Sequence, residues 1–229
     1  MMWVFIFLTA FCALAQGCPK IISRSSWGGV PSKCQAKLPR SVKYVIIHHT
    51  AGASCNSESA CKAQARNIQN FHMKSNGWCD TGYNFLIGED GQVYEGRGWE
   101  TVGAHAKNYN FNSIGISFMG TFTNRAPNTA AQKAAKDLIS CGVAKKGINS
   151  DYTLKGHRDV SATECPGTNL YNLIKNWPNF KGYYIDLFDK SSINRVSVEQ
   201  LFACFCHLLH NIIGCNIFQL SFEQYMRNI

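Results

Sequence analysis

Residues 44–52 read Tyr44-Val45-Ile46-Ile47-His48-His49-Thr50-Ala51-Gly52, an apolar, β-branched run that ends in two histidines. A run of this length and composition predicts a buried β-strand. His48 and His49 stand at the carboxyl end of that strand, where a side chain can project into a cleft. The same short segment therefore predicts a sheet strand and a place for chemistry.

Further strands are predicted within residues 83–118. Residues 83–88 and 92–94 flank Glu89-Asp90-Gly91, which is a strong hairpin signal. Residues 114–118, Ile-Gly-Ile-Ser-Phe, predict another strand. Together with the first strand they predict a central sheet on which helices pack.

Three segments predict helices. Residues 57–75 carry, at helical spacing, Cys61, Ala65, Ile68, Phe71 and His72, and Gly77 ends the pattern. Asn128 is a plausible cap for a helix with Ala131, Ala134, Ala135, Leu138 and Ile139 on one face. Residues 168–175 predict a last short helix. The fold class is α/β, with a central mixed β-sheet flanked by helices.

Composition narrows the classes of function. The chain has 229 residues, a formal net charge of +9, 16% charged and 45% hydrophobic residues, which excludes a largely disordered protein. It has no phosphate-binding loop and no G-x-G-x-x-G run, so nucleotide chemistry has no support. The chain has no block of Lys and Arg, so a nucleic-acid partner is not supported. A diffuse positive charge suits an anionic partner such as a cell-wall polymer or a membrane surface.

The amino terminus predicts secretion. Trp3 to Leu14 is an uncharged apolar run, and Ala13-Leu14-Ala15 is a small-x-small cleavage pattern. Residues 1–15 are therefore predicted to be a signal peptide, although no Lys or Arg precedes the run. A buried core strand is the alternative. Secretion places the protein outside the cell.

Secretion changes the interpretation of the 11 cysteines. Cys12 would leave with the signal peptide. The main body then holds an odd set of seven: Cys18, Cys34, Cys55, Cys61, Cys79, Cys141 and Cys165. Even sets pair in an oxidising compartment, so one is left as a free thiol or a ligand. Counting does not identify it, although the neighbourhood of Cys165 suggests a ligand.

Chemistry-bearing residues gather at the first strand and in one later loop. Gly156-His157-Arg158-Asp159 opens this loop, which ends with Thr163-Glu164-Cys165-Pro166-Gly167. Two imidazoles and one thiolate form a known catalytic zinc set with the fourth position open. Neither C-x-x-C nor H-E-x-x-H is present, so spacing alone also allows His48 to be a core histidine and Cys165 to be half of a disulfide.

Four motifs, in order, give the chain a family resemblance. They are Val45-Ile46-Ile47-His48-His49-Thr50-Ala51-Gly52, Cys79-Asp80-Thr81-Gly82-Tyr83-Asn84-Phe85-Leu86-Ile87-Gly88, Val93-Tyr94-Glu95-Gly96-Arg97-Gly98-Trp99 and Gly156-His157-Arg158-Asp159. Together they resemble the peptidoglycan recognition proteins, the animal branch of the type-2 N-acetylmuramoyl-L-alanine amidase fold. The similarity covers residues 18–181.

The resemblance implies a zinc site with His48, His157 and Cys165 as ligands. Cys165 discriminates, since amidase members have Cys there and recognition-only members commonly have Ser, a poor zinc ligand. Tyr83 matches a tyrosine of active members that hydrogen-bonds the zinc water or the developing oxyanion; the alternative is a half-buried strand tyrosine. Thr163 matches a position that assists the oxyanion. No Glu stands at an obvious general-base position.

The implied reaction is hydrolysis of the amide between the lactyl group of N-acetylmuramic acid and L-alanine, as part of innate immunity against bacteria. Two alternatives remain. One is a recognition or bactericidal module that binds peptidoglycan without turnover. The other is a zinc peptidase, although the usual helix motif of that class is missing.

The resemblance also implies contacts with the muramyl peptide. Gly77, Trp78 and Arg97 match the set of members that prefer meso-diaminopimelate to lysine in the stem peptide. A guanidinium can hold the extra carboxylate of diaminopimelate through two hydrogen bonds. The alternatives are a solvated hairpin charge for Arg97 and a packing role for Trp78. Thr50, His72, His105 and Asn110 match other groove positions.

Six cysteines fit the disulfides of that family, namely Cys18–Cys141, Cys34–Cys79 and Cys55–Cys61. Sequence alone permits 15 pairings of six cysteines, so this pairing rests on the resemblance. It leaves Cys165 free for a metal.

Residues 182–229 depart from the family. Leu201 to Leu220 has no Asp, Glu, Lys or Arg, and its length would permit a membrane span. Its polar residues, His207, His210, Asn211, Asn216 and Gln219, favour instead an amphipathic helix docked on the domain or on a partner. A non-native extension, such as a read-through, explains it equally well. Cys204, Cys206 and Cys215 have no assigned role.

Overall fold

The computed structural model describes residues 18–182. The predicted signal peptide and, apart from Gly182, the predicted C-terminal extension lie outside this range, as do Cys12, Cys204, Cys206 and Cys215. Within residues 18–182, no helix has the length and apolar character needed to cross a membrane.

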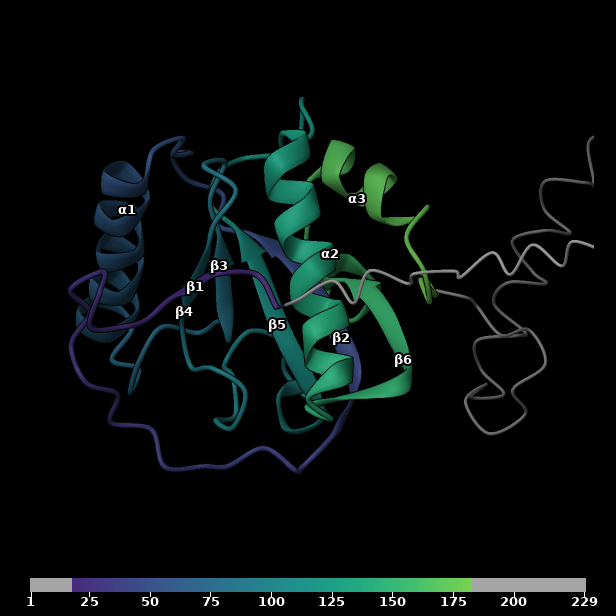
Figure 1. Cartoon of the computed structure of the whole chain (residues 1–229), viewed down its shortest axis with the longest axis horizontal. Coiled ribbons are helices and arrows are strands. Elements are labelled where there is room, and N and C mark those ends of the chain that lie inside the picture. Colours follow the sequence, from purple (N-terminus) through teal and green to yellow (C-terminus); the bar gives the residue numbers. More distant parts are fainter. Residues whose placement is uncertain (1–17, 183–229) are drawn as a thin grey trace, which may run out of the picture. The chain divides into compact units, whose positions relative to one another are not determined.

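A six-stranded mixed sheet forms the centre of the domain that residues 18–182 make (Figure 1). Its strands, in spatial order, are β1 (Ile21–Ile22), β4 (Val93–Glu95), β3 (Phe85–Ile87), β5 (Ser113–Phe118), β2 (Val42–His49) and β6 (Ile148–Gly156). β3 and β4 pair antiparallel, which confirms the predicted hairpin. All the other pairs are parallel. The predicted mixed α/β fold is therefore confirmed.

β2 lies between β5 and β6 and is buried over Val45–His49. Because side chains alternate along a strand, Val45 and Ile47 enter the main hydrophobic core, whereas Ile46 and His48 face the other side. On β5 the same alternation puts Ile114 and Ile116 in that core. The apolar run predicted from the sequence therefore divides between two buried faces, as expected for a parallel strand covered on both sides.

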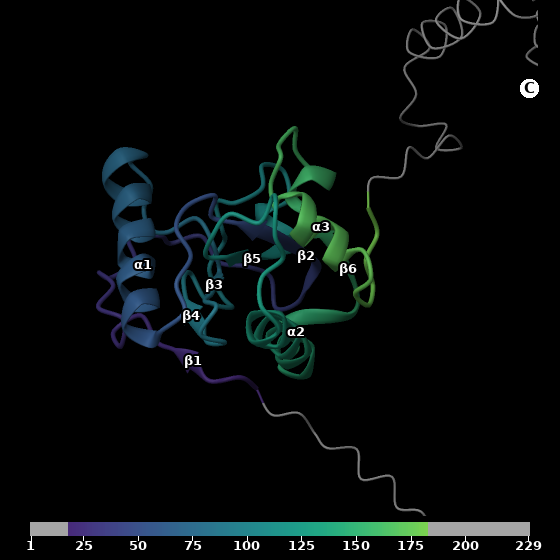
Figure 2. The same cartoon turned by 90° about the horizontal axis from the view of Figure 1, so that it is seen from above.

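Three α-helices lie around the sheet: α1 (Glu58–Asn70), α2 (Thr129–Ala144) and α3 (Thr168–Ile174). The side chains of Ser57 and Asn128 cap α1 and α2 by accepting backbone N–H groups three residues later. α2 and α3 pack into the core that holds Ile47, while α1 packs on a second core around Leu86. Figure 2 shows α1 standing apart from α2 and α3.

The end of the first predicted helix differs from expectation. After α1 the chain forms a π-helical turn, η1 (Phe71–Ser75). Phe71, predicted on the buried face, is 58% exposed, because ordinary helical spacing puts it to one side of the buried stripe formed by Cys61, Ala65, Ile68 and His72. His72 remains buried, as predicted. Such turns often occur at functional sites.

The sequence patterns do not predict β6. It begins Ile148-Asn149-Ser150-Asp151, whose polar residues do not read as a strand, and it lies at the edge of the sheet, paired with β2. Residues 149–151 are not buried. Polar residues are common on edge strands, because they discourage pairing with other chains.

Three disulfides close the domain: Cys18–Cys141, Cys34–Cys79 and Cys55–Cys61. This is the predicted pairing. Cys165 is the free cysteine among residues 18–182.

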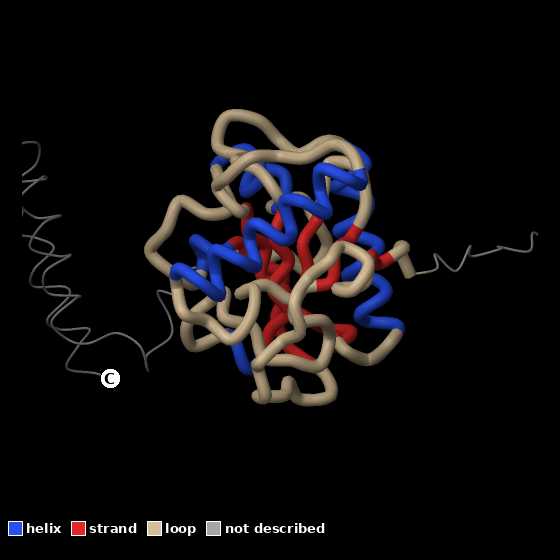
Figure 3. Tube along the Cα trace, turned by 90° about the vertical axis from the view of Figure 1, so that its left-hand side faces the viewer, coloured by secondary structure: helices blue, strands red, loops and turns tan. Residues whose placement is uncertain are grey.

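The parallel strands β5, β2 and β6 bring their carboxyl ends to one edge of the sheet. Figure 3 shows the strands in the centre, with helices and long loops around them. Loops at the carboxyl ends of parallel strands are the usual position of a ligand site. His48, near the end of β2, and η3 (His157–Asp159), directly after β6, meet at this edge.

Candidate metal centre and groove

Three possible metal ligands converge at the carboxyl end of β2. Ile47 pairs with Gly156, so the next residues, His48 and His157, emerge side by side with ring centroids 4.4 Å apart. Cys165 comes from the loop before α3, and its Sγ lies 3.7 Å from His48 Nδ1. One ligand atom from each of the three residues lies within 4.8 Å of the other two.

This donor set fits a zinc ion. Tetrahedral zinc, with bonds of about 2.0–2.3 Å, needs ligand atoms roughly 3–4 Å apart, which is close to the separation here. Burial lowers the pKa of both His48 and His157, so both rings are neutral and each has one unprotonated nitrogen able to coordinate. Burial raises the pKa of the Cys165 thiol to about 12, and a bound cation would reverse this.

Groups behind the ligands hold them in place. His48 Nε2 lies 3.0 Å from His105 Nδ1, which leaves Nδ1 of His48 facing Cys165. The backbone N–H of His49 donates to Cys165 Sγ at 3.4 Å. Burial, followed by the charges of His157 and Arg97, lowers the pKa of His105 to about 3.

The three residues open into a groove of about 400 Å³. Six other residues named from the sequence line it: Thr50, His72, Trp78, Tyr83, His105 and Thr163. The expected groove residues Gly77, Arg97 and Asn110 do not line it.

Tyr83 stands between the metal centre and the groove wall. Its ring centroid is 5.3 Å from that of His48 and 5.6 Å from that of His72. Burial, and next the charge of Cys165, raise the pKa of the phenol to about 12. The hydroxyl therefore keeps its proton at neutral pH and can donate a hydrogen bond.

His72 presents a defined hydrogen-bond donor to the groove. Its Nδ1 accepts the backbone N–H of Gly82 at 3.0 Å, so the ring proton of the neutral form is on Nε2. Burial, and next the charge of Arg97, lower its pKa to about 4. The Trp78 ring, 38% exposed, lies 4.8 Å from the His72 ring and offers an apolar surface.

The two threonines differ in setting. Thr50 Oγ1 accepts the backbone N–H of Gly120 at 2.9 Å, which fixes its hydroxyl oxygen at the end of β2. Thr163 is exposed, and its Oγ1 accepts the backbone N–H of Cys165 at 3.2 Å. Both hydroxyl protons are left for a ligand.

Arg97, Asn110 and Gly77 lie outside the groove lining, and the first two bond to backbone groups next to it. Arg97 donates from Nε to the Thr81 carbonyl and from Nη1 to the Val102 carbonyl, each at 2.6 Å. Asn110 Oδ1 accepts the backbone N–H groups of His105 and Ala106, each at 2.9 Å. Gly77 has a φ of +69°, which favours glycine, although a Cβ there would meet nothing within 4 Å.

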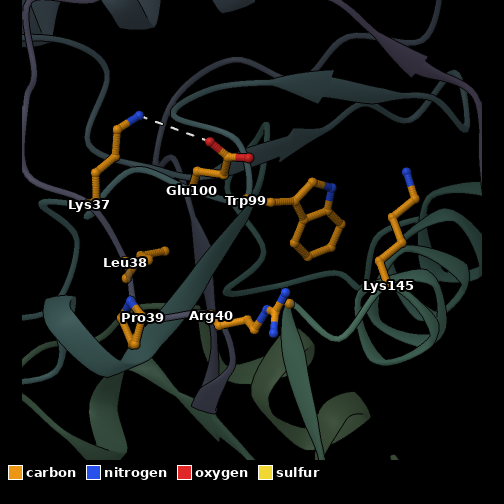
Figure 4. Close-up of a pocket in the computed structure, with 8 residues that line it drawn as sticks. Lys37, Leu38, Pro39, Arg40, Trp99, Glu100 and Lys145 are labelled. Carbon is orange, nitrogen blue, oxygen red and sulfur yellow. Dashed lines mark ion pairs between the residues drawn. The ribbon is translucent and has the colours of Figure 1, made fainter.

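A second, larger hollow of about 570 Å³ lies elsewhere on the domain (Figure 4). Basic and apolar side chains and Trp99 line it, and Lys37 forms an exposed ion pair with Glu100 at 4.0 Å. It contains none of the residues predicted to bind metal or ligand.

Two contributions to the site were not predicted. No role is predicted for His49 beyond its place beside His48; in the structure its backbone contacts Cys165 and the residue lines the groove. The partners of the His105 ring were also missed. The glycines that flank it, Gly103 and Gly115, were the available signal, since a Cβ at either would lie 2.4 Å from His105 Cδ2.

Comparison with known proteins places the chain in a family. Residues 38–168 match the family model described as N-acetylmuramoyl-L-alanine amidase. The chain is 49% identical over 180 residues to peptidoglycan recognition protein 1 of Bos indicus, covering 78% of this chain and 94% of that protein. It is 52% identical over 171 residues to peptidoglycan-recognition protein SC2 of Drosophila melanogaster, covering 75% and 93%.

A solved structure agrees with these relatives. Peptidoglycan recognition protein-LE, in complex with tracheal cytotoxin (monomeric diaminopimelic acid-type peptidoglycan), superposes with a TM-score of 0.69 at 44% identity, covering 71% of this chain and 96% of that chain. Sequence and fold lead to the same assignment: the chain belongs to the peptidoglycan recognition proteins of the N-acetylmuramoyl-L-alanine amidase family.

Proposed function

We propose that this chain is a secreted, zinc-dependent N-acetylmuramoyl-L-alanine amidase that binds bacterial peptidoglycan and cleaves the bond between the muramic acid lactyl group and L-alanine. The observation that carries the proposal is the convergence of His48, His157 and Cys165 beside the Tyr83 phenol. A groove that only bound a muramyl peptide would not require a buried thiol next to two imidazoles. Three disulfides support an oxidising, extracellular setting.

The residues of the groove divide the chemical work. His48, His157 and Cys165 would hold zinc, which when bound supplies Lewis acidity and a nucleophile at neutral pH. Tyr83, whose hydroxyl stays protonated, would donate a hydrogen bond to the oxygen that gains negative charge as the amide is attacked. Thr163, which also lines the groove, would assist the same oxygen.

Substrate binding would use the wall opposite the metal centre. His72 would donate from Nε2 to a carbonyl of the muramyl peptide, and the Trp78 ring would cover an apolar part of it. Thr50 adds a hydroxyl at the end of β2. These groups are uncharged, so they suit the amides and sugar hydroxyls of a muramyl peptide.

A preference for diaminopimelate-type peptidoglycan is the finer part of the proposal. Arg97 uses Nε and Nη1 on backbone carbonyls, and Nη2 has no hydrogen-bond partner among the described residues. A carboxylate could bind that free edge. The peptidoglycan recognition protein-LE complex contains a diaminopimelic acid-type ligand, which supports the same preference.

The test compares wild type with Cys165→Ser and Tyr83→Phe on purified diaminopimelate-type peptidoglycan. We expect wild type with zinc to release peptides, Cys165→Ser to lose zinc and activity together, and Tyr83→Phe to keep zinc but lose most turnover. Zinc content, measured separately, distinguishes loss of the metal from loss of chemistry.

Recognition without turnover is the competing function, and the names of the relatives refer to recognition. A folded, zinc-loaded wild type that binds the polymer and releases nothing would establish that function instead.

A further inference from the structure

Behind the metal centre, polar groups form a chain that begins at His48 and runs into the domain. His48 Nε2 contacts His105 Nδ1 at 3.0 Å, His105 Nε2 contacts Ser113 Oγ at 3.4 Å, and Ser113 Oγ donates to the Tyr109 carbonyl at 2.8 Å. His105 is 7% exposed and Ser113 is fully buried. We call these four groups the histidine relay.

The hydrogen bond from Ser113 to the Tyr109 carbonyl determines which nitrogen of His105 carries the ring proton. A carbonyl oxygen can only accept, so the single hydroxyl proton of Ser113 points at Tyr109. Towards His105 the Ser113 oxygen can then only accept. The ring proton of His105 is therefore on Nε2, next to Ser113.

The same logic passes through His105 to His48. With its proton on Nε2, a neutral His105 has a lone pair at Nδ1, which faces His48 Nε2. The proton between them must belong to His48. His48 thus carries its proton on Nε2, and its Nδ1 has a free lone pair directed at Cys165 Sγ, 3.7 Å away.

Two glycines hold the His105 ring in this orientation. A Cβ at Gly115 would lie 2.4 Å from Cδ2 and 2.7 Å from Nδ1 of His105, and a Cβ at Gly103 would lie 2.4 Å from Cδ2. The ring thus occupies a slot that only glycine backbone leaves open. Both ring nitrogens are engaged within the domain, so neither is free for a muramyl peptide.

We infer that His105 is a positioning residue for the metal ligand His48: the relay fixes the His48 tautomer, so that Nδ1 is presented for coordination before any metal arrives. The inference rests on the proposed zinc site. Hydrogen bonds of this kind to a ligating histidine orient the ring and strengthen it as a ligand, and their loss typically costs about ten- to a hundredfold in metal affinity.

The test uses variants that interrupt the relay at different points. His105→Leu removes both ring contacts. His105→Asn keeps an acceptor, since its Oδ1 can occupy the position of Nδ1. Ser113→Ala removes the end of the relay without touching the groove. Thr153→Ala is the control: it also truncates a buried, hydroxyl-bearing side chain of the sheet, at a position of β6 that pairs with Tyr44 rather than with His48.

Two readouts other than activity are measured. Long-range ¹H–¹⁵N spectra of histidine-labelled protein report the His48 tautomer without zinc, with His48→Gln as the assignment variant. Competition with a chromophoric chelator reports zinc affinity. We expect the Nε2–H form in wild type, a mixture of tautomers and about ten- to a hundredfold weaker zinc binding in His105→Leu, and a smaller loss in Ser113→Ala. His105→Asn should keep most of the affinity, and Thr153→Ala should match wild type.

Several results would overturn the inference. One is a His48 proton on Nδ1 in the metal-free wild type. Another is a folded His105→Leu variant in which the His48 tautomer and the zinc affinity are those of wild type. If that variant does not fold, unchanged tautomers of His105 and His48 in Ser113→Ala would also overturn the inference. Because the tautomer is measured without zinc, a wild type that failed to bind zinc would contradict the proposed function and still leave the relay tested.

Discussion

The segment of residues 79–83, which carries the groove residue Tyr83, depends on one buried carboxylate. Asp80 is fully buried and accepts from Arg24 Nη1 at 2.8 Å, Arg24 Nη2 at 2.6 Å, Gln69 Nε2 at 2.9 Å and the Thr81 backbone N–H at 2.7 Å. Asp80→Asn replaces an acceptor by a donor, leaving the Arg24 guanidinium without its counter-charge. We expect the change to destabilise the domain and loosen the segment that carries Tyr83.

The magnitude follows from burial. Removing one partner of a buried ion pair costs about 3–5 kcal/mol, and the Arg24 side chain is 17% exposed, so the lower end, about 3 kcal/mol, is expected. The matched control is Asp137→Asn, which breaks the Lys133–Asp137 pair at 2.5 Å on α2, where the lysine is 68% exposed. That change should cost about 0.5 kcal/mol.

Urea unfolding followed by fluorescence gives both free energies. In an Arg24→Gln background the unpaired charge is absent, so Asp80→Asn should cost clearly less than in wild type. The reasoning would be refuted if Asp80→Asn lost less than about 1 kcal/mol, or lost the same free energy in both backgrounds.

Three further predictions concern protons and specificity. Zinc binding at pH 7.5 should release about one proton, because the Cys165 thiol is protonated without metal while the histidine ligands are already neutral. Calorimetry in buffers of different ionisation enthalpy measures the number of protons released. If no proton were released, Cys165 would not bind zinc as a thiolate. Without zinc, the free energy of unfolding should fall as the pH drops below 6.5, by about 1.4 kcal/mol per pH unit for each of His72 and His105. The unfolded chain takes up protons on both residues in this range, whereas in the folded chain their pKa values are about 4 and 3. Urea unfolding at pH 7 and pH 5 tests this, and equal free energies of unfolding would refute it. Arg97→Ala should remove any preference for diaminopimelate over lysine muramyl peptides in calorimetric binding, with exposed Arg40→Ala as the control; a preserved preference would exclude Arg97.

Short-range sequence patterns predict most of the elements of the fold. The β-branched run of β2, the Glu89-Asp90-Gly91 turn and the Asn128 cap act over a few residues, so they predicted their elements correctly. β6 could not be read in this way, because its pairing with β2 rather than its composition makes it a strand. The π-helical turn at residues 71–75 follows no spacing rule, so the sequence predicts a continuous helix there.

In the candidate site, too, short motifs predict the residues but not the contacts between distant segments. The motifs identified His48, His157 and Cys165, which the structure brings together. The contacts of Arg97 with two backbone carbonyls, and those of the His105 ring, join segments that only the folded chain places side by side. Neither composition nor spacing contains that information.

The central claim is tested most directly by mass spectrometry of the soluble products formed when zinc-loaded wild type and Cys165→Ser act on diaminopimelate-type peptidoglycan. The account predicts stem peptides with a free L-alanine amino terminus, matched by glycan carrying free lactyl carboxylates, from wild type only. Glycan fragments with intact stems, cleavage within the peptide, or no product from a wild type that binds both zinc and polymer would contradict it.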